Sequence, residues 1–139
     1  MGTVSESRKE MKARLSLYRR AEAQRIILIE RRERIIAELR QTNTNPDTPN
    51  AALNEIDATL TAQIREQDNM MLDAVELMAR LPSGTIERTI VELRHIEGLS
   101  WAAISRAVGL SQSPLFVHYD TALDLLIKSL STEGDSSST

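Results

Sequence analysis

The fold of this chain is decided by residues 98–111, which read Gly-Leu-Ser-Trp-Ala-Ala-Ile-Ser-Arg-Ala-Val-Gly-Leu-Ser. Ser100 can cap a short helix, because its hydroxyl can accept a hydrogen bond from a free amide of the first turn. Trp101, Ile104 and Val108 then recur at the spacing of one helical face. The stretch therefore predicts a short helix with an apolar side that packs against other parts of the chain.

A turn and a second helix are predicted to follow. Gly109 provides the positive φ with which a helix can end, and Ser111 can cap the next helix. We expect that helix over residues 112–130. Its predicted buried seam consists of Tyr119, Leu123, Leu126 and Leu130. This layout is a helix-turn-helix, and a small helical unit used only for packing is the alternative interpretation.

The rest of the chain is also predicted to be helical. We expect helices over residues 5–40, 51–80 and 85–97, separated by residues 41–50 and 81–84, which contain Pro, Asn or Gly. These residue types interrupt helices. The two long helices can fold back as an antiparallel hairpin or cross between the subunits of a dimer.

The first long helix carries two neighbouring apolar stripes. One stripe consists of Leu15, Tyr18, Ile26, Ile29 and Ile36, and the other of Leu17, Ala21, Leu28, Ile35 and Leu39. A pair of long helices has little core of its own, so we expect self-association into a homo-oligomer.

These patterns predict an all-α fold in which a long helical hairpin or coiled coil precedes a small helix-turn-helix unit. Residues 1–80 form the hairpin or coiled coil, with dimerisation as its expected role. Residues 81–130 form the helix-turn-helix unit. Residues 131–139 are polar and rich in Ser, and we expect them to be a disordered tail.

The composition gives little support for catalysis or metal binding. There is no Cys, and His95 and His118 are the only histidines. Disulfides and thiolate metal sites are therefore excluded. Asp120 and Asp124 lie one helical turn apart and could share a divalent ion, although a solvated helix face is the preferred interpretation. We expect a protein that is not an enzyme and that needs no metal or cofactor.

The chain has no apolar run long enough to span a bilayer, and its first residues lack the apolar core of a signal peptide. The sequence therefore predicts a cytoplasmic protein that does not enter a membrane.

The charge is distributed unevenly. Residues 1–40 carry eleven Lys and Arg against six Asp and Glu, whereas the remainder carries six against fourteen. This asymmetry fits a nucleic-acid-binding arm, or pairing between the two halves, which is the preferred interpretation. The basic residues that could attract phosphates non-specifically are Arg19, Arg20, Arg31 and Arg32.

From Leu81 onward the chain resembles region 4 of bacterial sigma factors and the related transcriptional regulators of Gram-positive phages, of the ArpU and RinA kind. The residues that carry the resemblance are the run from Leu93 to Trp101, then Ile104, the run from Val108 to Ser111, Leu115, Ala122 and Leu123. His95 and Leu110 stand where the family typically has Tyr.

The resemblance implies a transcriptional regulator of the phage or mobile-element type that binds double-stranded DNA. In this family the second helix of the motif enters the major groove, and residues near its amino end face the bases. Ser111, Gln112 and Ser113 occupy that end, and Gln112 could contact adenine. Arg106 and His118 are the expected contacts to the DNA backbone.

The expected reading helix departs from the family pattern. Residues 112–121 contain no Lys or Arg, and residues 82–130 carry four basic against five acidic side chains. Because phosphate neutralisation drives most affinity for DNA, this unit alone should bind weakly. The alternative is a protein-interaction module that docks on RNA polymerase or another protein through Phe116, Val117 and Tyr119. A DNA-packaging recognition subunit ranks lower, since its helix-turn-helix would be expected first.

Overall fold

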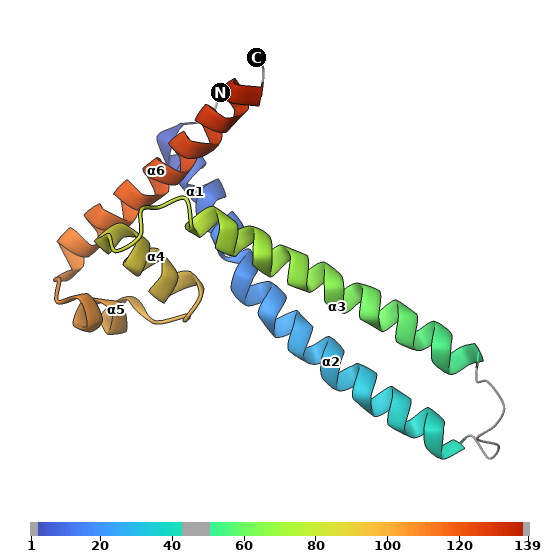
Figure 1. Cartoon of the computed structure of the whole chain (residues 1–139). Helices are drawn as coiled ribbons and strands as arrows, with labels where there is room; N and C mark the ends of the chain where they lie inside the picture. Colours follow the sequence, from blue (N-terminus) through green and yellow to red (C-terminus); the bar gives the residue numbers. More distant parts are fainter. Residues whose placement is uncertain (1–2, 43–50, 138–139) are drawn as a thin grey trace.

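The structure, a computed structural model, describes residues 3–42 and 51–137, and within these ranges it contains six α-helices and no strand (Figure 1). The helices are α1 (Val4–Leu15), α2 (Leu17–Thr42), α3 (Ala51–Met78), α4 (Ile86–His95), α5 (Trp101–Val108) and α6 (Gln112–Ser137). The predicted all-α fold is confirmed. None of the described helices is both long enough and apolar enough to cross a membrane.

Helices α2 and α3 lie side by side and antiparallel, and we refer to this pair as the arm (Figure 1). The predicted hairpin therefore forms within a single chain. Ala21 and Leu28 of α2 are buried against α3, whose Leu60 is buried in turn. The second of the two predicted stripes thus faces α3, whereas Ile26 of the first stripe is 48% exposed. Most of the predicted break, residues 43–50, lies outside the described residues.

Charged pairs accompany the apolar seam of the arm. Arg25 of α2 pairs with Asp68 of α3, and Arg32 Nε lies 2.6 Å from Asp57 Oδ1. Each of these four side chains is between 39% and 47% exposed. Exposed pairs of this kind contribute little stability, on the order of 0–1 kcal/mol each. The pairs fit the preferred interpretation of the charge asymmetry, which is pairing between the basic first helix and acidic residues later in the chain.

Helices α1, α4, α5 and α6, together with the last turns of α3, form the second part of the molecule, which we call the head (Figure 1). Its core is contiguous and almost entirely apolar. The buried residues are Met11, Leu15, Ala74, Leu77, Met78, Leu81, Ile90, Val91, Ile104, Leu115, Tyr119, Ala122, Leu123 and Leu126. Three of the four residues of the predicted seam of α6 belong to this core, and the fourth, Leu130, packs against it.

The single helix predicted over residues 5–40 is interrupted at Ser16. The Ser16 hydroxyl donates a hydrogen bond of 2.8 Å to the Lys12 carbonyl, which also accepts the Ser16 amide at 2.9 Å. Serine bonds of this kind to the preceding turn often bend helices. Helix α1 packs on α6 and buries Met11 and Leu15 in the core of the head, so this segment is not simply the start of the hairpin.

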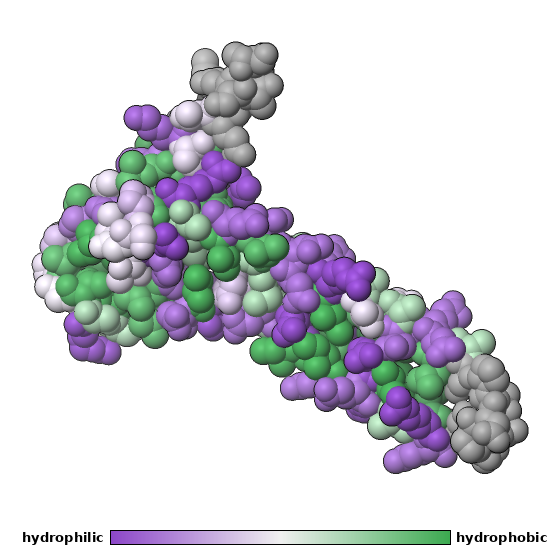
Figure 2. Space-filling model, in the orientation of Figure 1, coloured by the Kyte–Doolittle hydropathy of each residue, from purple (hydrophilic) through white to green (hydrophobic). Residues whose placement is uncertain are grey.

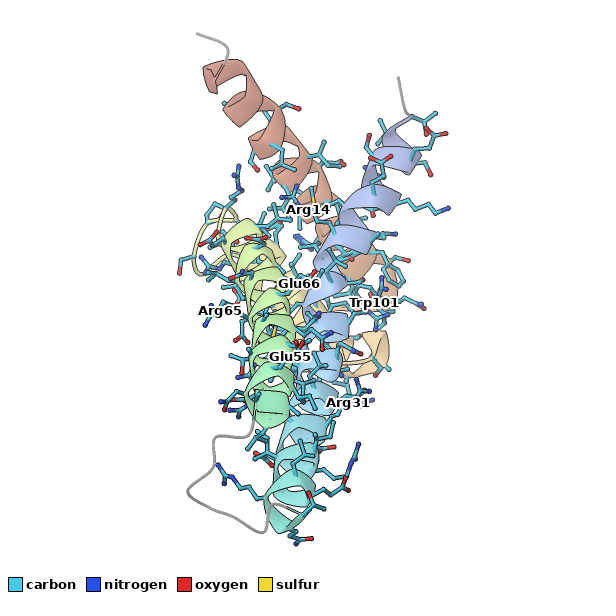
Figure 3. All side chains as sticks on the ribbon, turned by 90° about the vertical axis from the view of Figure 1, so that its right-hand side faces the viewer. Arg14, Arg31, Glu55, Arg65, Glu66 and Trp101 are labelled. Atoms are coloured by element: carbon cyan, nitrogen blue, oxygen red, sulfur yellow. The ribbon has the colours of Figure 1, made fainter. Side chains whose placement is uncertain are left out.

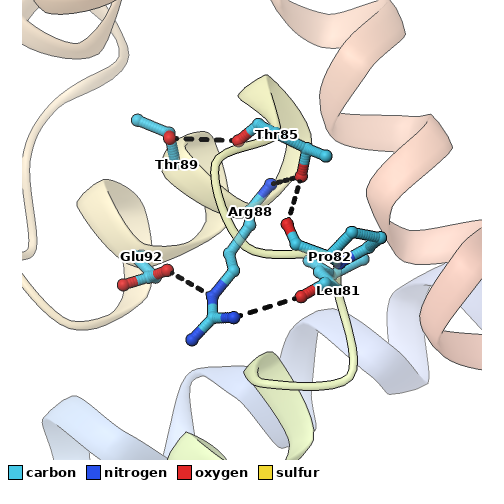
Figure 4. Close-up of polar contacts among 6 residues, drawn as sticks. All are labelled: Leu81, Pro82, Thr85, Arg88, Thr89 and Glu92. Atoms are coloured by element: carbon cyan, nitrogen blue, oxygen red, sulfur yellow. Dashed lines mark hydrogen bonds and ion pairs between the residues drawn. The ribbon is translucent and has the colours of Figure 1, made fainter.

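The connection from α3 to α4 is held by polar contacts around Arg88 (Figure 4). Thr85 caps α4 by accepting the Arg88 amide at 3.3 Å. The Arg88 guanidinium donates to the Leu81 carbonyl at 3.3 Å and to Glu92 Oε1 at 2.8 Å. Arg88 therefore joins the turn after the arm to the first helix of the predicted helix-turn-helix unit.

Helix α6 continues to Ser137, beyond the end predicted at Leu130. Residues 131–137 are thus helical where the sequence predicted a disordered tail. The Ser131 and Thr132 hydroxyls donate to the carbonyls of Ile127 and Lys128, at 3.4 Å and 3.1 Å. Polar composition alone indicated disorder, but hydroxyl groups can be satisfied by the preceding helical turn.

Candidate nucleic-acid interface

The geometry predicted for the helix-turn-helix stretch is present in the head. The Ser100 hydroxyl accepts the Ala103 amide at 3.1 Å, which caps α5. Gly109 ends α5 with φ +72° and ψ +28°, a left-handed conformation that suits glycine. The Ser105 hydroxyl donates to the Leu110 carbonyl and ties α5 to the turn. Ile104 is completely buried, so α5 is fixed against α6 and the core.

Aromatic side chains join α5 to α6. Trp101 meets Phe116 edge to face at a centroid distance of 5.0 Å, and meets Tyr119 at 4.8 Å in the same manner. The Arg94 guanidinium lies over the Trp101 ring, 4.6 Å from its centroid. Edge-to-face rings and cation–π contacts each add about 0.5–1.5 kcal/mol to a packed interface. Helix α6 is therefore held at a defined angle to α5.

A buried polar pair lies behind these rings. A hydrogen bond of 2.7 Å joins His95 Nε2 to the Tyr119 hydroxyl. Burial lowers the pKa of His95 to about 4 and raises the pKa of Tyr119 to about 12. Both side chains are therefore neutral at pH 7. Tyr119 is only 3% exposed, so it does not lie on the protein-docking surface for which the sequence had suggested it.

Four of the five side chains predicted to contact DNA are exposed at the start of α6 and on α5. They are Arg106, Ser111, Gln112 and Ser113. Within the part of the chain that the structure describes, the Arg106 guanidinium and the Gln112 amide form no hydrogen bond or ion pair. The Ser111 carbonyl accepts the Leu115 amide at 3.1 Å, whereas the predicted cap by the Ser111 hydroxyl does not form.

His118 is placed differently from the prediction. Its Nδ1 lies 2.9 Å from Glu87 Oε1 of α4, and the hydrogen bond is partly buried. This hydrogen bond lowers the pKa of the Glu87 carboxyl, and burial opposes the shift. His118 thus joins α6 to α4, and a contact from His118 to the DNA backbone stays a prediction.

Phe116 and Val117, which belong to the alternative protein-docking site together with Tyr119, do reach the surface. Val117 is 65% exposed, the most exposed of the large apolar side chains in the described residues. Phe116 is partly exposed, with its ring against Trp101. The start of α6 therefore presents polar and apolar groups but no positive charge of its own.

The acidic pair on α6 contacts a cation of the protein itself. Arg8 of α1 donates to both carboxylate oxygens of Asp124, at 2.9 Å and 2.7 Å, and lies 3.6 Å from Asp120. These bonds raise the pKa of Arg8 and lower that of Asp124. No group of three or more His, Cys, Asp or Glu in the described residues is arranged to hold a metal ion.

The basic residues suggested for phosphate attraction fall into two groups. Arg19 donates to the Glu97 carbonyl at 3.4 Å, and Arg32 is paired with Asp57, so both side chains already contact the protein. Arg20 and Arg31 are exposed on the arm. Sequence reasoning did not place Lys9 and Lys12 of α1 beside α6, because nothing near these lysines in the sequence indicates that α1 packs on α6.

Comparisons of this chain with models of known protein families, with curated proteins and with solved structures found no match.

Proposed function

We propose that this chain is a cytoplasmic transcriptional regulator of the phage or mobile-element type, which binds double-stranded DNA through α5 and α6. The observation that carries the proposal is the exposed amino end of α6, where Ser111, Gln112 and Ser113 project beside the fixed turn at Gly109. In helix-turn-helix proteins this end of the second helix enters the major groove. The resemblance to sigma factor region 4 over the same residues supports the same function.

The individual roles follow from the chemistry of the exposed side chains. The Gln112 amide can pair with adenine through two hydrogen bonds, and such a contact contributes about 1–3 kcal/mol of discrimination between bases. Ser113 can contact a base or a phosphate. Arg106 on α5 carries an unpaired positive charge that suits the DNA backbone. No cofactor takes part in this proposal.

A selection from a random duplex library, followed by affinity measurements across a salt series, tests the proposal. We expect Gln112→Ala to relax the preference at one base position and Arg106→Ala to weaken binding to all duplexes. Gln63→Ala, an exposed substitution on the arm, is the matched control for Gln112→Ala and should change neither property. Failure of the full chain to bind any duplex at low salt would refute the function.

A second candidate, docking on RNA polymerase or another protein, is favoured by one observation. Val117 is 65% exposed near the start of the expected reading helix, where a phosphate backbone offers it no apolar partner. If this candidate holds, Val117→Asp abolishes binding to purified RNA polymerase while the chain shows no affinity for duplex DNA.

We also propose that the arm assembles copies of the chain into a homo-oligomer. The accessible surface is 9216 Å², whereas a monomeric protein of 15.6 kDa is expected to expose roughly 7,200 Å². An excess of about 2,000 Å² is of the size that one subunit buries in an obligate dimer. Ile26 and Leu72 are about half exposed, and Figure 2 shows apolar residues at the surface along the arm. Light scattering of the full chain gives the subunit number.

A further inference from the structure

We infer that α1 provides the phosphate-binding charge that the reading helix lacks, so that Lys9 and Lys12 contact the backbone of a bound nucleic-acid duplex. This inference rests on the proposed function, because it concerns the same surface of the head. It adds a second element to that surface, from a helix that ends at Leu15, 97 residues before α6 begins at Gln112.

The first observation is a cleft between α1 and the helix-turn-helix. Its volume is about 430 Å³, and the residues that line it include Phe116 and Asp120 of α6, Lys12 of α1 and Arg94 of α4. Because Phe116 and Asp120 follow Ser113 on α6 at the spacing of one helical face, the cleft flanks the surface that would enter the groove.

The second observation is that this cleft continues along α1. A neighbouring hollow is lined by Arg8, Lys9 and Lys12, and it shares Lys12 and Asp120 with the first. Lys9 and Lys12 lie one helical turn apart, and both are exposed. Within the described residues the Lys9 ammonium has no carboxylate partner. The Lys12 ammonium lies 5.8 Å from the centroid of the Tyr119 ring, which is neutral. Lys12 likewise has no carboxylate partner in the described part of the chain.

The third observation concerns the carboxylates that would repel a phosphate. Asp120 and Asp124 are the acidic residues of α6 nearest to the cleft, and Arg8 contacts both. Arg8 donates two charge-assisted hydrogen bonds, one to each carboxylate oxygen of Asp124. A bidentate pair of this kind neutralises a carboxylate well. Because Arg8 already pairs with these two carboxylates, Lys9 and Lys12 remain available to contact an external anion.

Arg94, which also lines the cleft, supports the same assignment. Its guanidinium stacks on Trp101 and donates to the Leu99 carbonyl at 3.0 Å, which fixes its plane. A guanidinium has five N–H donors, so this bond leaves others available for an external acceptor. Including α1 also changes the charge of the unit. Residues 82–130 carry four basic and five acidic side chains, and α1 adds four basic and two acidic.

The shape and charge of this surface favour a duplex backbone over a single small anion. The basic groups are spread over α1 and α4 along an open cleft, rather than converging on one enclosed point. Successive phosphates on a strand present the complementary pattern of negative charge. Each Lys–phosphate contact releases condensed counterions, which makes its contribution measurable as a salt dependence.

The experiment measures the affinity of the full chain for a mixed-sequence DNA duplex across a salt series. We expect the double variant Lys9→Gln with Lys12→Gln to lower the slope of log K against log salt by about two, roughly one for each lost phosphate contact. The matched control is Arg34→Gln with Arg65→Gln, which removes two exposed positive charges from the arm. Figure 3 shows Arg65 on α3, on the side away from Trp101, so the control should keep the full slope.

The outcomes separate this inference from the function on which it rests. Binding by the unaltered chain with the same slope in the α1 variant would overturn the inference and leave the DNA-binding function standing. A slope lowered equally by the arm control would also overturn it, because the effect would then reflect net charge alone. No binding at low salt would overturn the function itself. Circular dichroism of each variant verifies that its helix content is unchanged, and its thermal unfolding verifies that its stability is unchanged.

Discussion

The head and the arm are both built from α-helices, yet they differ in how much core they form. In the head, helices cross from several directions and enclose a contiguous core of buried residues. In the arm, two antiparallel helices share one seam, in which Ala21, Leu28 and Leu60 are buried and charged pairs flank the contact. Helices that pack around a common core from several sides thus remove more apolar surface from water than two helices that meet along a single seam.

The difference has a functional consequence. A rigid head fixes the side chains at the start of α6, as a reading surface requires. An arm with a thin seam leaves Ile26, Ile27 and Leu72 about half exposed. Apolar side chains left at the surface of a two-helix pair favour association with further helices. This difference fits the proposed division of roles, in which the head binds DNA and the arm assembles copies of the chain.

Matched truncations in the two parts give the largest expected effect. Ile104→Ala removes a fully buried side chain from the head, and we expect it to lower the free energy of unfolding by about 3–4 kcal/mol. Leu28→Ala in the arm should cost only about 1–2 kcal/mol, because its surroundings can relax into solvent. Urea unfolding followed by circular dichroism measures both values. Equal losses would contradict the distinction between the two parts.

Acid should weaken the head through His95, whose pKa falls to about 4 on folding from an ordinary value of 6.5. Above pH 6.5 His95 is neutral in both states and contributes no pH dependence. Between pH 6.5 and 4 His95 binds a proton in the unfolded chain but stays neutral in the folded chain. Stability should therefore decline over this window, by about 3 kcal/mol in total.

The control for this effect is the double variant His95→Phe with Tyr119→Phe, which replaces both partners of the buried hydrogen bond by apolar rings of similar shape. Its stability should fall less between pH 6.5 and 4 than that of the unaltered chain. The carboxylates titrate in both proteins, so the difference between the two profiles isolates His95. Identical profiles would show that the buried histidine is not the source.

The local features of the head could be predicted from the sequence because their causes are local. The cap at Ser100 and the left-handed turn at Gly109 depend on residues within one or two helical turns. The apolar face of α5 follows from the same short stretch. The periodic apolar residues of the two long helices likewise predicted that the helices pair, but they left open whether the pair is a hairpin within one chain or crosses between subunits, since either needs only a seam on each helix.

The parts that sequence reasoning missed depend on distant contacts. Nothing in α1 indicates that it packs on α6, because its apolar stripe continues into α2 through Tyr18, and Ser16 is compatible with a helix. The partner of Asp124 is Arg8, 116 residues away. His118 pairs with Glu87, which is 31 residues away in sequence. Spacing along the chain identified these side chains as chemically capable, but only the packing of helices decides what each of them contacts.

Two glycines of the head adopt left-handed conformations, and one of them lies against the arm. Gly98 and Gly109 have φ values of +71° and +72°. Replacing either by Ala should cost about 1–2 kcal/mol, because a Cβ disfavours this conformation. At Gly109 the added Cβ would meet no atom within 4 Å, so Gly109→Ala measures the backbone strain alone.

At Gly98 the added Cβ would meet the guanidinium of Arg19, which belongs to the arm and donates to the Glu97 carbonyl at 3.4 Å. Because this guanidinium ends a flexible side chain, it can move aside at little cost, and we expect Gly98→Ala to exceed Gly109→Ala by less than about 0.5 kcal/mol. A double-mutant cycle of Gly98→Ala with Arg19→Ala isolates the coupling. A coupling well above this value would mean that Arg19 holds the arm rigidly to the head, and the two parts could not then be treated as independent in stability.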